Sequence, residues 1–145
     1  MTRSSKDPSA SSRAHLLLRL SLLVNVAVLI PVCVALSAFG EAEPITQAWG
    51  PPTAGRGILL SIYFAILAGS VLLLWLHLRA ADKAAVEHAA AALLATQILY
   101  KVTTPATAGA SNPVAISNLA ISVVHAATLS ALWRQHIAAG ARRAR

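Results

Sequence analysis

The 145-residue chain is poor in charged residues, in aromatic residues and in cysteine. Charged residues account for 12% of the chain and hydrophobic residues for 57%, a balance that excludes an ordinary soluble globular domain. With Cys33 as its single cysteine, the sequence can form neither an intramolecular disulfide nor a thiolate metal cluster. Because apolar runs dominate what is left, we predict a membrane protein.

Four apolar runs cover most of the sequence, namely residues 20–38, 58–78, 84–102 and 113–133. Each contains about 19–21 residues, the length at which an α-helix rising about 1.5 Å per residue crosses a bilayer core of about 30 Å. The prediction is therefore an all-α membrane protein, with four transmembrane helices in an antiparallel up-down bundle.

The predicted domain organisation has three parts. Residues 1–15 are expected to form a disordered basic tail, because they lack apolar periodicity. Residues 16–136 are expected to form the four-helix transmembrane domain, and residues 137–145 a second basic tail. The first helix is expected to stay uncleaved, because its apolar run is longer than the roughly 7–15 residues of a signal-peptide core.

Basic segments alternate with segments that hold few basic residues. Both predicted tails and the connection Arg79–Lys83 are basic. Loop 39–57 has Arg56 as its single basic residue, and loop 103–112 has none. Because basic loops stay in the cytoplasm, we expect both termini to be cytoplasmic and to contact anionic lipid headgroups. Alanine and arginine usage favours a bacterial inner (cytoplasmic) membrane. No interleaved aromatic residues accompany the basic ones, so no nucleic-acid partner is predicted.

The connections between the runs carry loop signals. Proline and glycine predict an irregular first loop, and Thr103-Thr104-Pro105 is expected to end the third helix. The connection His77–His88 includes Asp82 and Glu87, but its spacing fits no standard metal motif. We predict that these are solvated loop residues, so that the membrane interior holds no carboxylate and no metal ion.

Polar residues recur at helical spacing in the last two apolar runs. Gln97 and Lys101 are four residues apart on one face of the third predicted helix. Asn118, Ser122 and His125 share one face of the fourth. The two faces predict a polar stripe where these helices meet.

The depth of these side chains predicts their partners. The rise of a helix places Lys101 and Asn118 near the outer end and His125 near the middle of the bilayer. We expect both Gln97 and Lys101 to contact Asn118, and His125 to contact Asn25 of the first run. The candidate polar pocket therefore consists of Asn25, Gln97, Lys101, Asn118, Ser122 and His125.

Two interpretations of this stripe stay open. Polar side chains within membrane helices commonly form interhelical hydrogen bonds that hold a bundle together. An ionisable residue at such depth is also a candidate site, here a pocket open to the outside that binds a polar or anionic solute near Lys101. In such a pocket His125 would serve as a protonatable gate.

The leading functional prediction is a non-enzymatic membrane protein, either a complex subunit or a small solute-binding or transport component. The alternative is a membrane enzyme acting on a lipid-borne substrate, with His125 as general base and Lys101 as an oxyanion or phosphate contact. The predicted lack of carboxylates in the spans weighs against this enzyme. No cofactor is predicted. The expected partner is the lipid bilayer, together with a homo-oligomer or a larger membrane complex.

Overall fold

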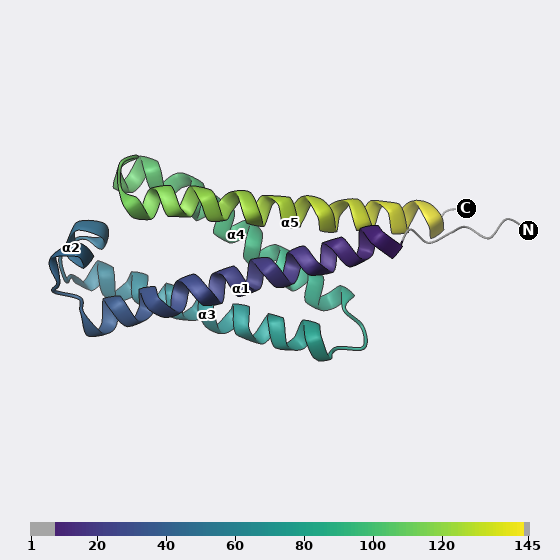
Figure 1. Ribbon diagram of the computed structural model, residues 1–145, viewed down its shortest axis with the longest axis horizontal. Coiled ribbons are helices and arrows are strands. Elements are labelled where there is room, and N and C mark those ends of the chain that lie inside the picture. The colour runs from purple at the N-terminus through teal and green to yellow at the C-terminus, as the bar shows by residue number, and fades with distance from the viewer. Residues whose placement is uncertain (1–7, 144–145) are drawn as a thin grey trace, which may run out of the picture.

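The computed structural model describes residues 8–143, which form five helices and no strand. The helices are α1 (Pro8–Ala38), α2 (Glu43–Trp49), α3 (Ala54–Arg79), α4 (Ala84–Ala108) and α5 (Pro113–Arg143). The four long helices run alternately in opposite directions, and α2 lies at the end opposite the chain termini (Figure 1). We call these two ends the α2 end and the terminal end of the bundle.

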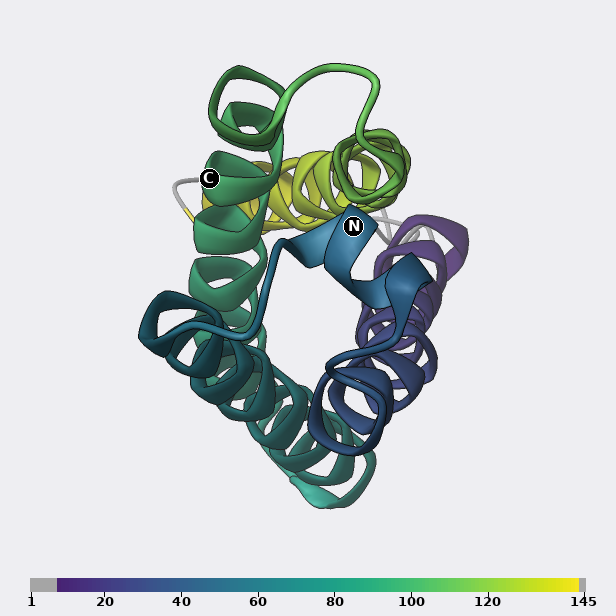
Figure 2. The same cartoon turned by 90° about the vertical axis from the view of Figure 1, so that its left-hand side faces the viewer.

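The long helices pack in a ring. α1 contacts α3 and α5, and α4 contacts the same two helices, so α1 and α4 lie on opposite sides of the bundle (Figure 2). α1 and α5 are close together toward the terminal end and separate toward the α2 end (Figure 1). The short helix α2 contacts α5 at this wider end. The seam between α1 and α5 is therefore tight in one half of the bundle and open in the other.

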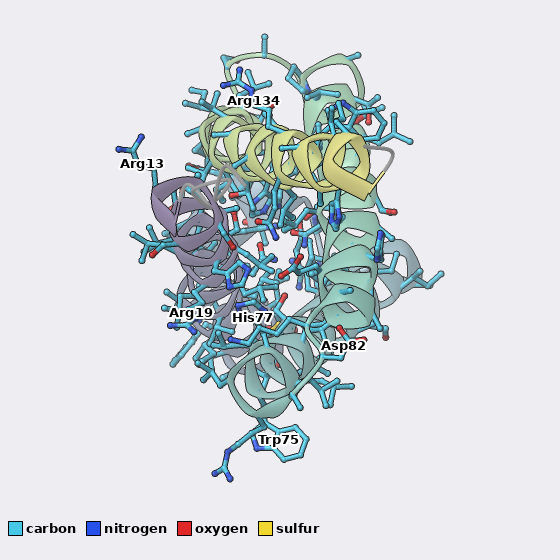
Figure 3. All side chains as sticks on the ribbon, turned by 90° about the vertical axis from the view of Figure 1, so that its right-hand side faces the viewer. Arg13, Arg19, Trp75, His77, Asp82 and Arg134 are labelled. Carbon is cyan, nitrogen blue, oxygen red and sulfur yellow. The ribbon has the colours of Figure 1, made fainter. Side chains whose placement is uncertain are left out.

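The distribution of side chains differs from that in a soluble protein, because large apolar residues are exposed and charged residues are buried. Large apolar residues such as Val123 and Trp75 are exposed on the outside, whereas Lys101 and Glu87 are buried inside. Figure 3 shows Trp75 projecting outward while His77, two residues further along α3, points into the bundle. Apolar residues outside and polar residues inside are expected of a protein surrounded by lipid.

Three helices are long and apolar enough to cross a membrane, over residues Ser11–Ala38, Ala54–Arg79 and Pro113–Ala141. These three helices are consistent with a small integral membrane protein. The predicted span 84–102 is not among them. The physical reason is composition, because α4 consists largely of alanine and threonine and also carries charged and amide side chains.

Helices α1 and α5 extend into both predicted tails. Residues 8–15 and 137–143, which belong to the tails predicted from the sequence, are helical. Tail residues 1–7 and 144–145 lie outside the described part of the chain. Pro8 suits the first turn of a helix, where its missing N–H has no intrahelical acceptor. The alanine- and arginine-rich segment at the other end has a high helix propensity.

Two further helix boundaries differ from the prediction. The first loop, predicted to be irregular, contains the seven-residue helix α2, with Pro44 in its first turn. Helix α4 continues through Thr103-Thr104-Pro105 to Ala108, so the prediction that this stretch ends the helix is wrong. Proline at this position removes only one N–H donor from the helix. The helix ends instead before Gly109, whose φ of 93° lies in the left-handed region.

Two apolar clusters fill the ring of helices. The cluster nearer the terminal end includes Leu18, Leu22 and Leu94. The cluster nearer the α2 end includes Leu29 and Tyr63. Polar side chains lie between these clusters and at both ends, and they form the groups described next.

Candidate binding site

Lys101 is a buried cation on the inward face of α4, with 3% of its surface exposed. Its Nζ donates to the hydroxyl of Tyr100 at 2.6 Å and, over a longer 3.4 Å, to Oδ1 of Asn118 on α5. No carboxylate within residues 8–143 pairs with it, since the ion pairs of that range involve Glu87 near the terminal end. An ammonium has three N–H donors. In its protonated form Lys101 therefore has one N–H donor left for a further partner.

Asn118 fixes the position of Lys101 relative to α5. Its Nδ2 donates to Oγ1 of Thr104 at 3.1 Å, and that hydroxyl donates to the Tyr100 carbonyl at 2.9 Å. The predicted contact between Lys101 and Asn118 is thus present. The hydroxyl of Ser122 donates to the Asn118 carbonyl at 2.9 Å, within its own helix. The bonds of the Asn118 side chain to Lys101 and Thr104 join α5 to α4 at the polar end of the site.

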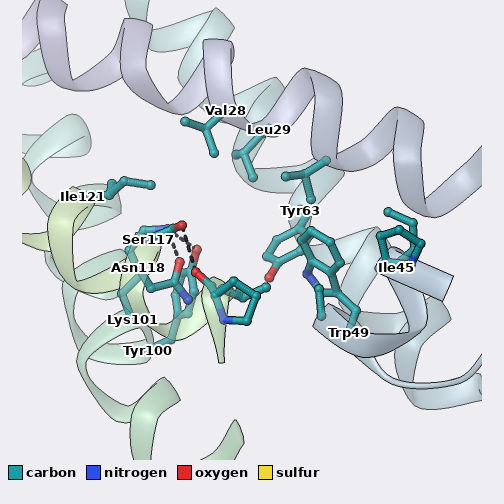
Figure 4. Close-up of a pocket in the computed structure, with 15 residues that line it drawn as sticks. Val28, Leu29, Ile45, Trp49, Tyr63, Tyr100, Lys101, Ser117, Asn118 and Ile121 are labelled. Carbon is teal, nitrogen blue, oxygen red and sulfur yellow. Dashed lines mark hydrogen bonds between the residues drawn. The ribbon is translucent and has the colours of Figure 1, made fainter. Parts of the chain in front are cut away.

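A cavity of about 340 Å³ lies beside Lys101 and Asn118 (Figure 4). Its volume falls within the range of about 300–1,000 Å³ that is typical of small-molecule sites. The hydroxyl-bearing side chains of Tyr63, Tyr100 and Ser117 also line it. The polar groups therefore come from α3, α4 and α5, and none of the described lining residues is acidic.

The rest of the cavity wall is apolar. α1 and α5 face each other across it, with the half-buried Val28 and Val32 on one side and Ile121 on the other. Trp49 and its neighbours on α2 close the side toward the α2 end. Ser117 is exposed, so the cavity reaches the outer surface of the bundle along the open part of the α1–α5 seam.

Trp49 adds an N–H donor to this wall. Its indole N–H is buried and interacts with the nearby Tyr63 hydroxyl, although it forms no hydrogen bond of good geometry within the described chain. Figure 4 places the indole ring beside Tyr63. The protonated Lys101 side chain is the one charged donor among the described lining residues, which favours an anionic group over a cationic one.

A second cavity, of about 500 Å³, lies on the other side of Tyr100 and Asn118. Its lining is more polar and includes Thr107 of α4 and Asn112 of the α4–α5 connection. The Asn112 amide donates to the carbonyl of Ala48 at 3.0 Å and so ties this connection to α2. The polar end of the site is therefore flanked by a polar cavity and an apolar one.

A separate polar group lies deeper, between the apolar clusters. His125 of α5 contacts Oδ1 of Asn25 through Nε2 at 3.1 Å, which is the predicted pair, and Ser21 through Nδ1 at 3.3 Å. Asn25 donates onward to Ser70 of α3 at 3.1 Å. Ser21 shares a hydrogen bond of 2.7 Å with Thr128. This chain of contacts joins α1, α3 and α5.

The six candidate residues thus do not form one pocket. Lys101 and Asn118 line the 340 Å³ cavity, whereas His125 and Asn25 do not. The predicted contact between Gln97 and Asn118 is wrong. Gln97 is only 1% exposed, and its amide nitrogen and oxygen have no partner in the described chain. Asn118 is already engaged on both sides of its amide. An unpaired buried amide destabilises a fold by about 1–3 kcal/mol. Because the Gln97 amide is unpaired, it can still donate and accept hydrogen bonds, one helical turn from Lys101.

Glu87 is not the solvated loop residue predicted from the sequence. It is 3% exposed in the first turn of α4, which also overturns the expectation that the bundle interior holds no carboxylate. His15 Nε2 lies 3.1 Å from one of its oxygens, and His136 Nε2 lies 3.8 Å from the other. The burial follows from the helical extensions of α1 and α5, which bring these histidines over the carboxylate.

His77 is buried beside this group, although the sequence suggested a solvated position. It is 0% exposed, and its ring packs edge-on against His15 with ring centroids 5.4 Å apart. Neither ring nitrogen has a hydrogen-bond partner in the described chain. Within residues 8–143 no three His, Cys, Asp or Glu side chains are arranged to hold a metal ion. The cluster joins all four long helices at the terminal end, away from the cavity of Lys101.

Comparison of the chain with protein-family models, curated proteins and solved structures finds no match. Within the described bundle, the cavity beside Lys101 combines a buried lysine, further polar side chains and space for a small ligand.

Proposed function

We propose that this chain is a four-span integral membrane protein of the bacterial inner membrane that binds a small anionic ligand without acting on it chemically. The observation that carries the proposal is Lys101, a buried ammonium beside a cavity of about 340 Å³ and without a carboxylate partner among the described residues. Charges within membrane helices are costly and mark sites by default. A bound anion supplies the missing counter-charge.

Helix α4 is the fourth span in this proposal. Glu87, Gln97 and Lys101 are buried within the ring, whereas Leu99 and Val102 face outward. A helix with this distribution can cross a bilayer when its neighbours cover the polar face, even though its overall composition is only moderately apolar. α3 and α5 are the neighbours that do so.

The orientation follows from charge. The basic residues at both chain ends and in the α3–α4 connection assign the terminal end to the cytoplasm, and the α2 end then lies outside. At the terminal end the basic residues meet anionic lipid headgroups. Assembly into a homo-oligomer or with other membrane subunits is compatible with this placement.

The position of His125 favours binding over catalysis. An enzyme acting on a lipid-borne substrate would need a general base within hydrogen-bond reach of the group held by Lys101. His125 does not line that cavity, and both of its ring nitrogens contact neighbours on α1. The cavity can thus hold an anion beside Lys101, and its lining in residues 8–143 includes no histidine or carboxylate that could act as a general base.

Trp49 provides a reporter for the test, because it lines the cavity. With Trp75→Phe and Trp133→Phe, Trp49 is the remaining tryptophan of the chain. In phosphatidylcholine nanodiscs, Lys101→Met is expected to weaken quenching of Trp49 by iodide severalfold, because the ammonium no longer attracts the anion. Quenching by the neutral molecule acrylamide is expected to stay unchanged.

Lys83→Met is the matched control, because it removes a positive charge at the terminal end. It is expected to leave quenching by both molecules unchanged. Equal iodide quenching with and without the charge of Lys101 would contradict the proposed anion site.

A further inference from the structure

We propose that the ligand is a single-chain amphiphile with an anionic head group, which enters from the outer leaflet between α1 and α5. This inference rests on the proposed function and adds the chemical class of the ligand and its route. It is carried by the shape and chemistry of the cavity, which is polar at one end and apolar along the remainder.

The head-group end is formed by Lys101 and its neighbours. The Lys101 ammonium has a third N–H besides the two directed at Tyr100 and Asn118. The Trp49 indole N–H lies beside the Tyr63 hydroxyl and forms no hydrogen bond of good geometry within the described chain. Tyr63 brings a further hydroxyl to the same cavity. A carboxylate or sulfonate accepts several such hydrogen bonds at once, and those to a charged donor are the strongest.

The remaining wall suits an aliphatic chain. Val28 and Val32 of α1 face Ile121 of α5 across the cavity, and none of the lining residues in the described part of the chain is acidic. A compact inorganic anion would leave this apolar surface without a partner. The volume of about 340 Å³ lies near the lower limit for ligand sites, which suits one chain better than the two of a phospholipid.

The route is set by the α1–α5 seam. The hydrogen bonds that join these helices lie at Leu17, Ser21 and Asn25 of α1, between the terminal end and a point just past the middle of the helix. Beyond Asn25 the described residues form no hydrogen bond across the seam, and the exposed Ser117 marks the rim of the cavity. An amphiphile in the outer leaflet therefore reaches Lys101 without leaving the lipid phase.

The test uses brominated quenchers on the single-tryptophan protein in phosphatidylcholine nanodiscs. We expect 9,10-dibromostearate to quench Trp49 at least about tenfold more effectively than its methyl ester, which has the same chain and no charge. Lys101→Met is expected to abolish this difference, and Lys83→Met to preserve it. Phosphatidylglycerol with dibrominated chains is the third probe, and is expected to quench less than dibromostearate at equal mole fraction.

Two cavity-filling variants test the apolar wall separately. Val28→Phe and Ile121→Phe narrow it from opposite sides, so each should weaken dibromostearate quenching while iodide quenching stays unchanged. Iodide quenching that depends on Lys101, combined with equal effects of the acid and its ester, would overturn the amphiphile inference and leave the proposed anion site intact. Stronger quenching by the brominated phosphatidylglycerol would overturn the single-chain assignment. If Lys101→Met changed neither the quenching by iodide nor the quenching by dibromostearate, the proposed function itself would be overturned.

Discussion

Gln97 and Lys101 occupy one face of α4 but are satisfied to different degrees by their surroundings. Lys101 donates to Tyr100 and Asn118, whereas both polar atoms of the Gln97 amide are buried without a partner in the described chain. A polar group of this kind destabilises the bundle unless water or a ligand reaches it. Gln97 is therefore the residue at which water or a ligand bound inside the bundle should change the stability of the bundle most directly.

Replacing the Gln97 amide tests whether it lacks a hydrogen-bond partner in the folded protein. In detergent, we expect Gln97→Leu to leave the free energy of unfolding unchanged or to raise it by up to about 1–3 kcal/mol, because the substitution removes an unpaired buried group. Asn118→Leu is the matched control and should lower the melting temperature, because Asn118 bonds to two side chains of α4. A clear loss of stability in Gln97→Leu would mean that the amide does have a partner.

Residue contacts were predictable where helical spacing alone determines them. The Lys101–Asn118 and His125–Asn25 pairs follow from depth along antiparallel helices. The burial of Glu87 could not be predicted in this way, because it depends on where distant helices begin and end. His15 reaches it only because α1 starts before the predicted span.

Helix α2 is the element that completes the pocket. It contributes Trp49 to the wall, and it is held by Asn112, whose amide donates to the Ala48 carbonyl. The sequence predicted only an irregular loop here, because several prolines and glycines surround the helix. Pro44 in the first turn was the available signal, since proline favours that position.

Removing the Asn112 contact should release α2 selectively. We expect Asn112→Ala to increase hydrogen exchange of the backbone amides of residues 43–49 by about tenfold, because a net hydrogen bond contributes about 0.5–1.5 kcal/mol. Exchange within the long helices should stay the same. Thr107→Ala is a suitable control, since the Thr107 hydroxyl bonds only to carbonyls of its own helix. Unchanged exchange in α2 would show that other contacts hold this helix in place.

At the scale of the whole molecule, the bundle has an apolar exterior and an interior in which polar side chains lie between and beside two apolar clusters. Exposed residues such as Val123 surround a ring in which α1, α3 and α5 are apolar enough to cross a membrane. The overall composition predicted this class of protein from the sequence. The sequence alone could not show which face of α4 is covered, because that depends on how α3 and α5 pack against it.

The proposed four-span arrangement would place Lys101 inside the bilayer and the two ends of α4 on opposite sides of the membrane. The direct measurement is cysteine labelling in intact cells and in permeabilised cells, in a Cys33→Ala background. Ala81→Cys and Ala110→Cys place a thiol at exposed positions in the connections before and after α4. A membrane-impermeant maleimide is expected to label Ala110→Cys in intact cells and Ala81→Cys only after permeabilisation. Labelling of both positions from the same side would contradict the claim that α4 crosses the membrane.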